Sequence, residues 1–316
     1  MKGNPLSALY GAVVAGRNAL YEHGVLRSRR LQGSVISVGN VSTGGSGKTP
    51  FVILLGELLK ARGIKFDVLS RGYGRRTRGV LLVDPGGLPR DFGDEPLLIA
   101  RKLQAPVIVG EDRYEAGRFA EERFGPQMHL VDDGFQHRGL ARDFDIVLVT
   151  PEDARDRLLP AGRLREPLQS LQRADAVVLA SGASAEAFPL TEKMVWRVRR
   201  GIAMQNVPAR PVVFCGIARP QNFLLQLRAA GIDPVAEAFF RDHHAYTEKD
   251  VRDLLELRRR SEAGGFVTTE KDAVNLGGYL EALAPLAVVP VKMELSDAAN
   301  AVDTMLRVIE ERRRRS

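Results

Sequence analysis

The sequence predicts an α/β protein with a larger and a smaller unit. Short apolar segments alternate with amphipathic segments along the 316 residues, and this order is typical of a parallel sheet covered by helices. The alternation is interrupted near residue 200 and then resumes, which indicates a second, smaller α/β domain. With 44% hydrophobic and 27% charged residues, the composition excludes a disordered or fibrous protein.

The first series of elements fills the amino-terminal two thirds of the chain. Its strands are short runs rich in valine, isoleucine and leucine, and its helices carry apolar residues every three or four positions. We expect strands at 34–38, 66–70, 106–109, 128–131, 145–149 and 175–180, and helices at 50–62, 94–103 and 114–123.

The second series follows a stretch in which polar and apolar residues alternate. Residues 194–201 and 203–207 meet at Gly201, so we interpret them as a β-ribbon that links two domains. We then expect strands at 211–215, 235–239, 265–268 and 287–291, and helices at 220–230, 247–259 and 296–312. The predicted boundaries are 1–192 for the larger domain, 193–210 for the ribbon and 211–316 for the smaller domain.

An amphipathic helix is expected ahead of the first strand. Apolar residues recur with helical spacing from Leu6 to Leu20, and the basic segment 27–30 follows them. No apolar run reaches the roughly 18 residues that a membrane-spanning helix needs. On these residues alone, the helix fits a membrane surface and its own domain equally well.

The formal net charge of +7 and the clustered arginines predict an anionic partner. We do not expect nucleic acid, because the clusters lack interleaved aromatic residues and no nucleic-acid-binding motif occurs. A phosphorylated substrate or an acidic membrane surface fits equally well. The lone cysteine, Cys215, excludes an internal disulfide and favours the reducing cytosol.

A glycine-rich turn after the first strand is typical of a phosphate-binding loop. Its glycines allow backbone N–H groups to face a phosphate chain, Lys48 can neutralise the outer phosphates, and the Thr49 hydroxyl can bind Mg²⁺. Ser42 stands where the common form of this motif has glycine. We therefore expect a P-loop NTPase-like domain that binds ATP and Mg²⁺ through Thr43, Gly44, Gly45, Ser46, Gly47, Lys48 and Thr49.

Carboxylates stand at two further element boundaries. Asp132 and Asp133 end an apolar strand, where a phosphate-loop enzyme places the acid that holds magnesium. Asp94 begins a predicted helix, and two interpretations stay open for it. It could cap the helix, or it could accept a hydroxyl proton during phosphoryl transfer.

Two of the five histidines, His243 and His244, follow Asp242 between a strand and a helix of the smaller unit. A zinc site would need more ligands at suitable spacing. We favour a histidine that orients a carboxylate, or shares a proton with it, across a cleft between the domains. The nearby turn 268–272 is similar to the guanine-reading motif of GTPases, but its lysine is displaced, so we do not expect a GTPase.

Several separated motifs are spread over nearly the whole length of the chain: Pro5-Leu6-Ser7 with Leu9-Tyr10, the loop 37–50, Ser70-Arg71-Gly72-Tyr73-Gly74, Gly93-Asp94-Glu95-Pro96, Asp132-Asp133-Gly134-Phe135-Gln136-His137, Gly162-Arg163-Leu164-Arg165-Glu166-Pro167, Asp242-His243-His244 and Thr269-Glu270-Lys271-Asp272. With these motifs in this order, the chain resembles the tetraacyldisaccharide 4'-kinases, the lipid A 4'-kinases of Gram-negative bacteria.

The resemblance implies that the chain transfers the γ-phosphoryl group of ATP to the 4'-hydroxyl of a tetraacyldisaccharide 1-phosphate. It implies a cytoplasmic protein that is peripheral on the inner face of the inner membrane, held there by its amino-terminal helix, with a smaller domain that closes over the nucleotide. The implied catalytic residues are Asp94, His243 and Asp133. The implied magnesium environment is Thr49, Asp132, Asp133 and Glu166, and the implied substrate contacts are Arg71, Asn40, Gln136 and Arg165.

Two other functions are compatible with the loop. A nucleotide-switched P-loop ATPase acting as a binding or scaffold protein would hydrolyse ATP slowly and form no phosphorylated product. An ATP-dependent ligase would form an acyl phosphate. The sequence predicts no particular oligomeric state.

Overall fold

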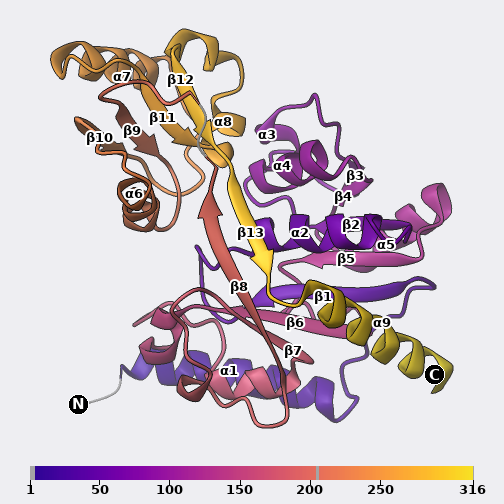
Figure 1. Cartoon of the computed structure of the whole chain (residues 1–316). Helices are drawn as coiled ribbons and strands as arrows, with labels where there is room; N and C mark the ends of the chain where they lie inside the picture. The colour runs from indigo at the N-terminus through magenta and orange to yellow at the C-terminus, as the bar shows by residue number, and fades with distance from the viewer. Residues whose placement is uncertain (1–3, 204–205, 316) are drawn as a thin grey trace.

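The computed structural model describes residues 4–203 and 206–315 and contains two sheets (Figure 1). The larger sheet contains β1 (Ser34–Asn40), β2 (Phe66–Ser70), β3 (Leu81–Leu82), β4 (Val107–Val109), β5 (Met128–Asp132), β6 (Phe144–Val149), β7 (Ala176–Leu179), β8 (Met194–Ile202) and β13 (Val291–Leu295). The smaller sheet contains β9 (Val212–Cys215), β10 (Ala236–Phe239), β11 (Phe266–Thr269) and β12 (Leu286–Val289).

The helices surround these sheets. They are α1 (Pro5–Glu22), α2 (Lys48–Lys60), α3 (Pro89–Phe92), α4 (Asp94–Leu103), α5 (Arg113–Phe124), α6 (Pro220–Ala229), α7 (Glu248–Arg260), α8 (Glu270–Leu276) and α9 (Ala298–Arg315). Most of the expected elements are present within a few residues of their predicted ends. The short elements β3, α3 and α8 were not predicted, because they are too short to give a periodic signal.

The larger sheet has the order β13-β8-β7-β6-β1-β5-β2-β4-β3. Its pairings from β4 to β8 are parallel, and the pairs β3–β4 and β8–β13 at its two edges are antiparallel. The smaller sheet is parallel, in the order β10-β9-β11-β12. The α/β class, with a parallel P-loop-type sheet and a second, smaller unit, is confirmed.

Alternate residues of the central strands face opposite sides of the larger sheet. Ile36 and Leu130 lie in one core with α2, α4 and α9, whereas Val35 and Val131 lie in another core with α5. Both faces are therefore covered. This explains why the strands read as continuous apolar runs rather than as alternating ones.

The linker between the sheets is a two-stranded ribbon, but not the one that the sequence suggested. β8 runs towards the smaller unit, and β13 returns beside it in the antiparallel direction (Figure 1). The expected local hairpin through Gly201 is wrong, because residues 203, 206 and 207 form no strand, and residues 204 and 205 lie outside the described ones. The single strand expected at 287–291 is two strands, β12 and β13, separated at Pro290.

The carboxyl-terminal residues return to the larger unit. α9 buries Val302, Met305 and Ile309 in the core that also contains Phe144 and Trp196. The boundary drawn at 211–316 therefore includes β13 and α9, which pack on the larger sheet.

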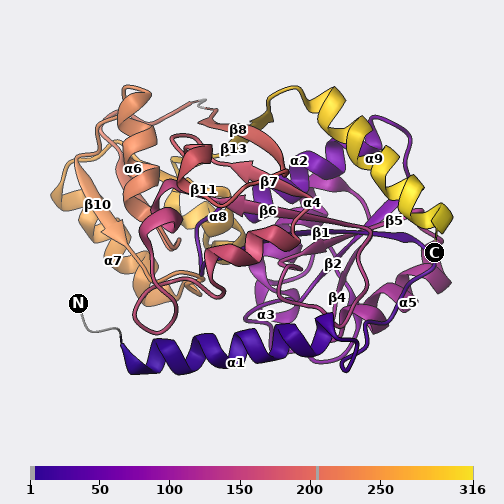
Figure 2. The ribbon, with the colours of Figure 1, turned by 90° about the horizontal axis from the view of Figure 1, so that it is seen from below.

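α1 lies along the outside of the molecule (Figure 2). It is attached mainly by polar contacts, since the Ser7 hydroxyl donates to the carbonyl of Leu158 (3.0 Å) and the Tyr10 hydroxyl donates to the carbonyl of Arg165 (3.0 Å). None of its residues is buried, and the apolar side chains Leu6, Leu9 and Val13 are between 60% and 64% exposed. Among the described residues, no helix has both the length and the apolar character needed to cross a membrane.

Candidate active site

The phosphate-binding loop lies between β1 and α2, at the carboxyl edge of the larger sheet. α2 begins at Lys48, and Gly47 precedes it with a φ of +86°. Gly44 and Gly45 also have positive φ, and added Cβ atoms there would lie 2.9 Å from Ala218 and from the Arg219 side chain. Glycine at these two positions therefore allows both the turn and the close approach of the smaller unit.

The Asn40 side chain is hydrogen-bonded to two residues of this loop. Its side chain is fully buried, donates to the Ser46 hydroxyl (2.8 Å) and accepts from the Lys48 ammonium (3.2 Å). The Arg165 guanidinium donates to its Oδ1, and the Gln136 amide donates to its carbonyl (3.0 Å). Of the four residues expected to contact the substrate, Gln136 and Arg165 are thus both bonded to Asn40, and the burial of Asn40 leaves its side chain no surface to present to a substrate.

Asp133 lies between two cations. Arg165 makes a bidentate pair with its carboxylate (2.9 and 2.7 Å), and the Lys48 ammonium is 3.5 Å away. Burial opposes ionisation, but Lys48 and Arg165 outweigh it and hold the pKa of Asp133 well below its usual range. The backbone at Asp133 has a φ of +51°, an uncommon conformation for a residue other than glycine that is often found at functional sites.

Asp132 is buried and incompletely bonded. Its Oδ2 accepts from the Ser70 hydroxyl (3.2 Å), but its Oδ1 has no hydrogen-bond partner among the described residues. Burial, together with the charges of Glu95 and Asp133, raises the pKa of Asp132 to about 7. A cation at this position would satisfy Oδ1 and stabilise the ionised form, so Asp132 has the chemistry of a magnesium ligand.

Glu166 does not share that position. Its carboxylate pairs with Arg173 (2.9 Å) and accepts from the Asn18 amide of α1 (2.9 Å). Arg173 also donates to its other oxygen (3.1 Å), so both carboxylate oxygens are bonded to the protein, and its place in the magnesium environment stays a prediction. The described residues contain no ready-made group of three or more metal-binding side chains.

Asp94 meets His243 across the two units. His243 Nδ1 lies 3.0 and 2.9 Å from the two carboxylate oxygens of Asp94, and Asn275 donates to Oδ2 (3.1 Å). The interpretation of Asp94 as a helix cap is wrong, because Gly93 is the capping residue and Asp94 is the first residue of α4. Burial would raise the pKa of Asp94, but the hydrogen bond with His243 and the charge of Lys271 lower it below its ordinary value.

The two neighbouring histidines have different partners. His243 has a φ of +57°, which directs its ring at Asp94, whereas His244 Nε2 is 3.1 Å from Asp250 in the capping box of α7. The structure therefore places His243, and not His244, at the carboxylate.

Lys271 is a site residue that the sequence analysis passed over as part of a charged turn. It begins the short helix α8 with Glu270, and its ammonium lies 2.9 Å from Asp242, 3.5 Å from Glu95 and 3.3 Å from His243 Nε2. Only the family motif signalled it, because its partners lie far away in the sequence.

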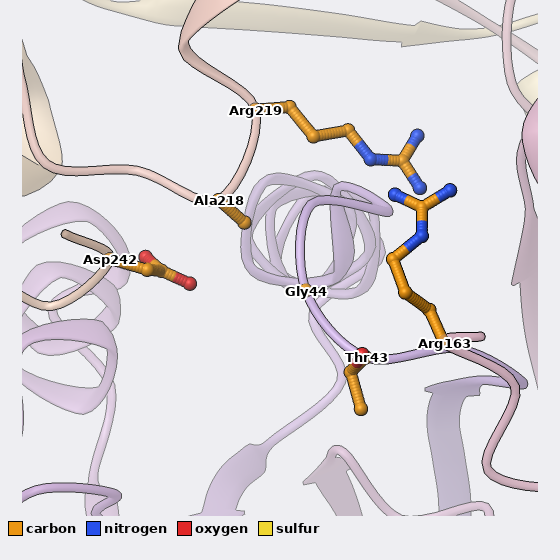
Figure 3. Close-up of a pocket in the computed structure, with 6 residues that line it drawn as sticks. All are labelled: Thr43, Gly44, Arg163, Ala218, Arg219 and Asp242. Atoms are coloured by element: carbon orange, nitrogen blue, oxygen red, sulfur yellow. The ribbon is translucent and has the colours of Figure 1, made fainter. Parts of the chain in front are cut away.

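A pocket of about 280 Å³ lies between the loop and the smaller unit; it is lined by Thr43, Gly44, Arg163, Ala218, Arg219 and Asp242. Figure 3 shows Arg163 and Arg219 on one side of Gly44 and Asp242 on the other side. Since Asp242 immediately precedes His243, the Asp94–His243 pair and the phosphate-binding loop belong to one site.

Two further arginines lie near the acidic strand end. Arg71 is exposed after β2, and its role as a substrate contact stays a prediction. Arg113, which the sequence analysis missed, is buried, and burial together with the nearby charge of Arg71 lowers its pKa, whereas Asp132 and Asp133 oppose that shift.

Comparison with known proteins gives consistent matches. A model of the family described as tetraacyldisaccharide-1-P 4'-kinase matches residues 3–310. The tetraacyldisaccharide 4'-kinase of Koribacter versatilis is 53% identical over 98% of this chain and 99% of its own length. The enzyme of the same name from Aquifex aeolicus is 38% identical over 87% of this chain and 89% of its own length.

A solved structure matches nearly the whole fold. It is the crystal structure of LpxK from Aquifex aeolicus in complex with ATP, with a TM-score of 0.79 and 35% sequence identity. The match covers 96% of this chain and 98% of that chain.

Proposed function

Because the chain belongs to the tetraacyldisaccharide-1-P 4'-kinase family, we propose that it transfers the γ-phosphoryl group of ATP to the 4'-hydroxyl of a tetraacyldisaccharide 1-phosphate. The chain is an ATP-dependent kinase of lipid A biosynthesis. The observation that carries the site assignment is the pocket at which Gly44 of the phosphate-binding loop meets Asp242, the residue next to His243.

Asp94 is the base in this proposal. The sugar oxygen attacks the γ-phosphorus, its proton passes to the Asp94 carboxylate, and the bond from the γ-phosphorus to the bridging oxygen breaks as ADP leaves with the electron pair. The lowered pKa keeps Asp94 ionised at neutral pH. A weak base suffices, because the transition state of phosphoryl transfer is loose and depends mainly on positioning and charge.

The loop and the acidic strand end bind the nucleotide. Backbone N–H groups of the glycine turn and the Lys48 ammonium would contact the phosphates. Asp133, ionised between Lys48 and Arg165, would keep that lysine in place. Thr49 and Asp132 would hold the magnesium ion that accompanies ATP, and the ion neutralises phosphate charge.

α1 is the proposed membrane contact. Its exposed leucine and valine side chains form an apolar surface, and the basic segment 27–30 follows it. An apolar helix face beside arginines suits an anionic bilayer surface, and this would place the kinase on the inner face of the inner membrane, where its lipid acceptor lies. Arg71, which is exposed after β2, would then contact the acceptor.

Mass spectrometry of the lipid after incubation with ATP and magnesium tests the proposal. We expect the acylated disaccharide 1-phosphate to gain the mass of one phosphoryl group. ATP hydrolysis without any phosphorylated lipid would instead support a nucleotide-switched ATPase.

A further inference from the structure

Lys271 carries a buried positive charge at the junction of the two units. Its side chain is 16% exposed, and its ammonium faces Asp242 of its own unit (2.9 Å) and Glu95 (3.5 Å) and Asp94 (3.8 Å) of the larger unit. Burial would lower the pKa of Lys271, but the three carboxylates raise it, so the side chain stays charged.

The same ammonium also faces the histidine ring. His243 Nε2 lies 3.3 Å from the Lys271 ammonium and 3.7 Å from Asp242 Oδ2, while Nδ1 faces Asp94. The remaining close neighbour is the Tyr73 ring, whose centroid is 5.1 Å from that of His243. An ammonium group can only donate hydrogen bonds, so the contact with Lys271 requires Nε2 to be an acceptor.

Charged groups near His243 have opposing effects on whether its ring takes up a second proton. Burial lowers the pKa of His243, Asp94 and Asp242 raise it, and Lys271 lowers it; the overall shift is upward. Asp94 would therefore favour the doubly protonated imidazolium. Lys271 disfavours that form, because its ammonium faces Nε2, the nitrogen that would take up the second proton. The approach of Lys271 to Nε2, closer than that of Asp242, favours the singly protonated ring.

We propose that Lys271 is a positioning residue that donates a hydrogen bond to Nε2 of His243 and thereby confines the single ring proton to Nδ1, facing Asp94. This inference rests on the proposed role of Asp94 and extends it. Without Lys271, Nε2 would take a proton and donate to Asp242. The resulting imidazolium would neutralise Asp94 and weaken its ability to accept the hydroxyl proton.

Nitrogen-15 NMR of the histidine rings in the full-length protein tests the inference. In the wild type at about pH 8, we expect His243 Nδ1 to carry the proton and Nε2 to carry none. In Lys271→Met, we expect the His243 titration midpoint to rise by about one pH unit or more. Lys102→Met is the matched control, because it removes a neighbouring ion pair between the units, with Glu270, that does not reach His243. The signal is assigned with His243→Gln.

Two further variants and the kinetics separate positioning from a structural role. Lys271→Gln retains a donor without charge and is expected to keep the Nδ1 proton even if the methionine variant folds poorly. For Lys271→Met we expect kcat to fall about tenfold at neutral pH and to recover as the pH rises above the new midpoint, with KM for ATP nearly unchanged. A merely structural defect would lower kcat at every pH.

The outcomes distinguish the inference from the function on which it rests. A wild-type ring with its proton on Nε2, or a titration midpoint that Lys271→Met leaves unchanged, overturns the role of Lys271 even if Asp94 is essential. Full turnover by Asp94→Asn would overturn the proposed base while leaving the NMR result intact.

Discussion

His243 Nδ1 lies 2.9 Å from Asp94 Oδ2, although the two residues are 149 positions apart and belong to different units of the fold. α4 presents the carboxylate at its first residue, and the loop after β10 presents the ring. The pair exists only while the smaller unit is packed against the larger one. In the proposed mechanism, catalysis is therefore tied to the contact between the units.

Replacement of His243 is expected to slow turnover. His243→Ala removes the group that orients Asp94, and we expect kcat to fall by about 10²-fold with little change in ATP affinity. Steady-state kinetics measures this. His244→Ala is the matched control, because that ring pairs with Asp250 and not with Asp94; equal losses in the two variants would contradict the assignment.

Lys48→Met is expected to weaken nucleotide binding. The substitution removes the ammonium group at the first residue of α2, which lies beside Asn40 and Asp133. We expect ATP affinity, measured by isothermal titration calorimetry, to fall at least about tenfold. Lys60→Met changes the other end of the same helix, where the ammonium donates to a carbonyl, and is expected to bind ATP normally.

The exposed face of α1 is expected to bind anionic vesicles. The triple variant Leu6→Gln/Leu9→Gln/Val13→Gln loses about 2 kcal/mol or more of apolar contact with the bilayer. We therefore expect less of the protein to cosediment with the vesicles. Leu225→Gln, on the exposed surface of α6 at 61% exposure, is the control. Unchanged sedimentation of the triple variant would exclude α1 as the membrane contact.

A buried histidine near the start of β5, His129, predicts how stability depends on pH. His129 Nδ1 lies 2.9 Å from Asp67, and Nε2 lies 3.3 Å from Glu121. Burial alone would lower the pKa of His129, but Asp67 and Glu121 raise it, and burial raises the pKa of Asp67. At these two sites the folded protein therefore binds more protons than the unfolded chain.

The sign of the effect follows from this excess of bound protons. The stabilisation from His129 is complete below about pH 6.5 and is lost as the pH rises through the folded-state pKa, at up to about 1.4 kcal/mol per pH unit. Urea unfolding across this range measures the slope. The double variant Asp67→Asn/His129→Asn leaves no unpaired buried charge between these two residues and should show a smaller slope; an unchanged slope would refute the linkage.

Much of the fold could be read from local patterns. The strand and helix ends around Lys48 and Asp132 follow from apolar runs and glycine turns, which depend on neighbouring residues. The partner of β8 could not be read this way, because β13 lies far along the chain and the nearby segment 203–207 offered a local alternative. Pairing over such distances leaves no local signal.

For the same reason, only part of the site could be predicted from the sequence. The P-loop and the acids at the strand end are contiguous motifs, so the sequence predicted them directly. Lys271 belongs to a charged turn whose partners Glu95 and Asp94 come from the other unit, and the positive φ values of Asp133 and His243 are set by tertiary packing. Glu166 was assigned to the metal through the family motif, but its neighbours are Arg173 and Asn18.

Product formation by Asp94→Asn tests the account most directly. Asparagine retains the shape of the side chain but cannot take a proton from the sugar hydroxyl, so we predict normal ATP binding and a loss of lipid phosphorylation of at least about 10²-fold by quantitative mass spectrometry. Asp91→Asn, in the adjoining helix α3, should phosphorylate the lipid at the wild-type rate. Wild-type product formation by Asp94→Asn would contradict the central claim that this carboxylate accepts the proton of the acceptor.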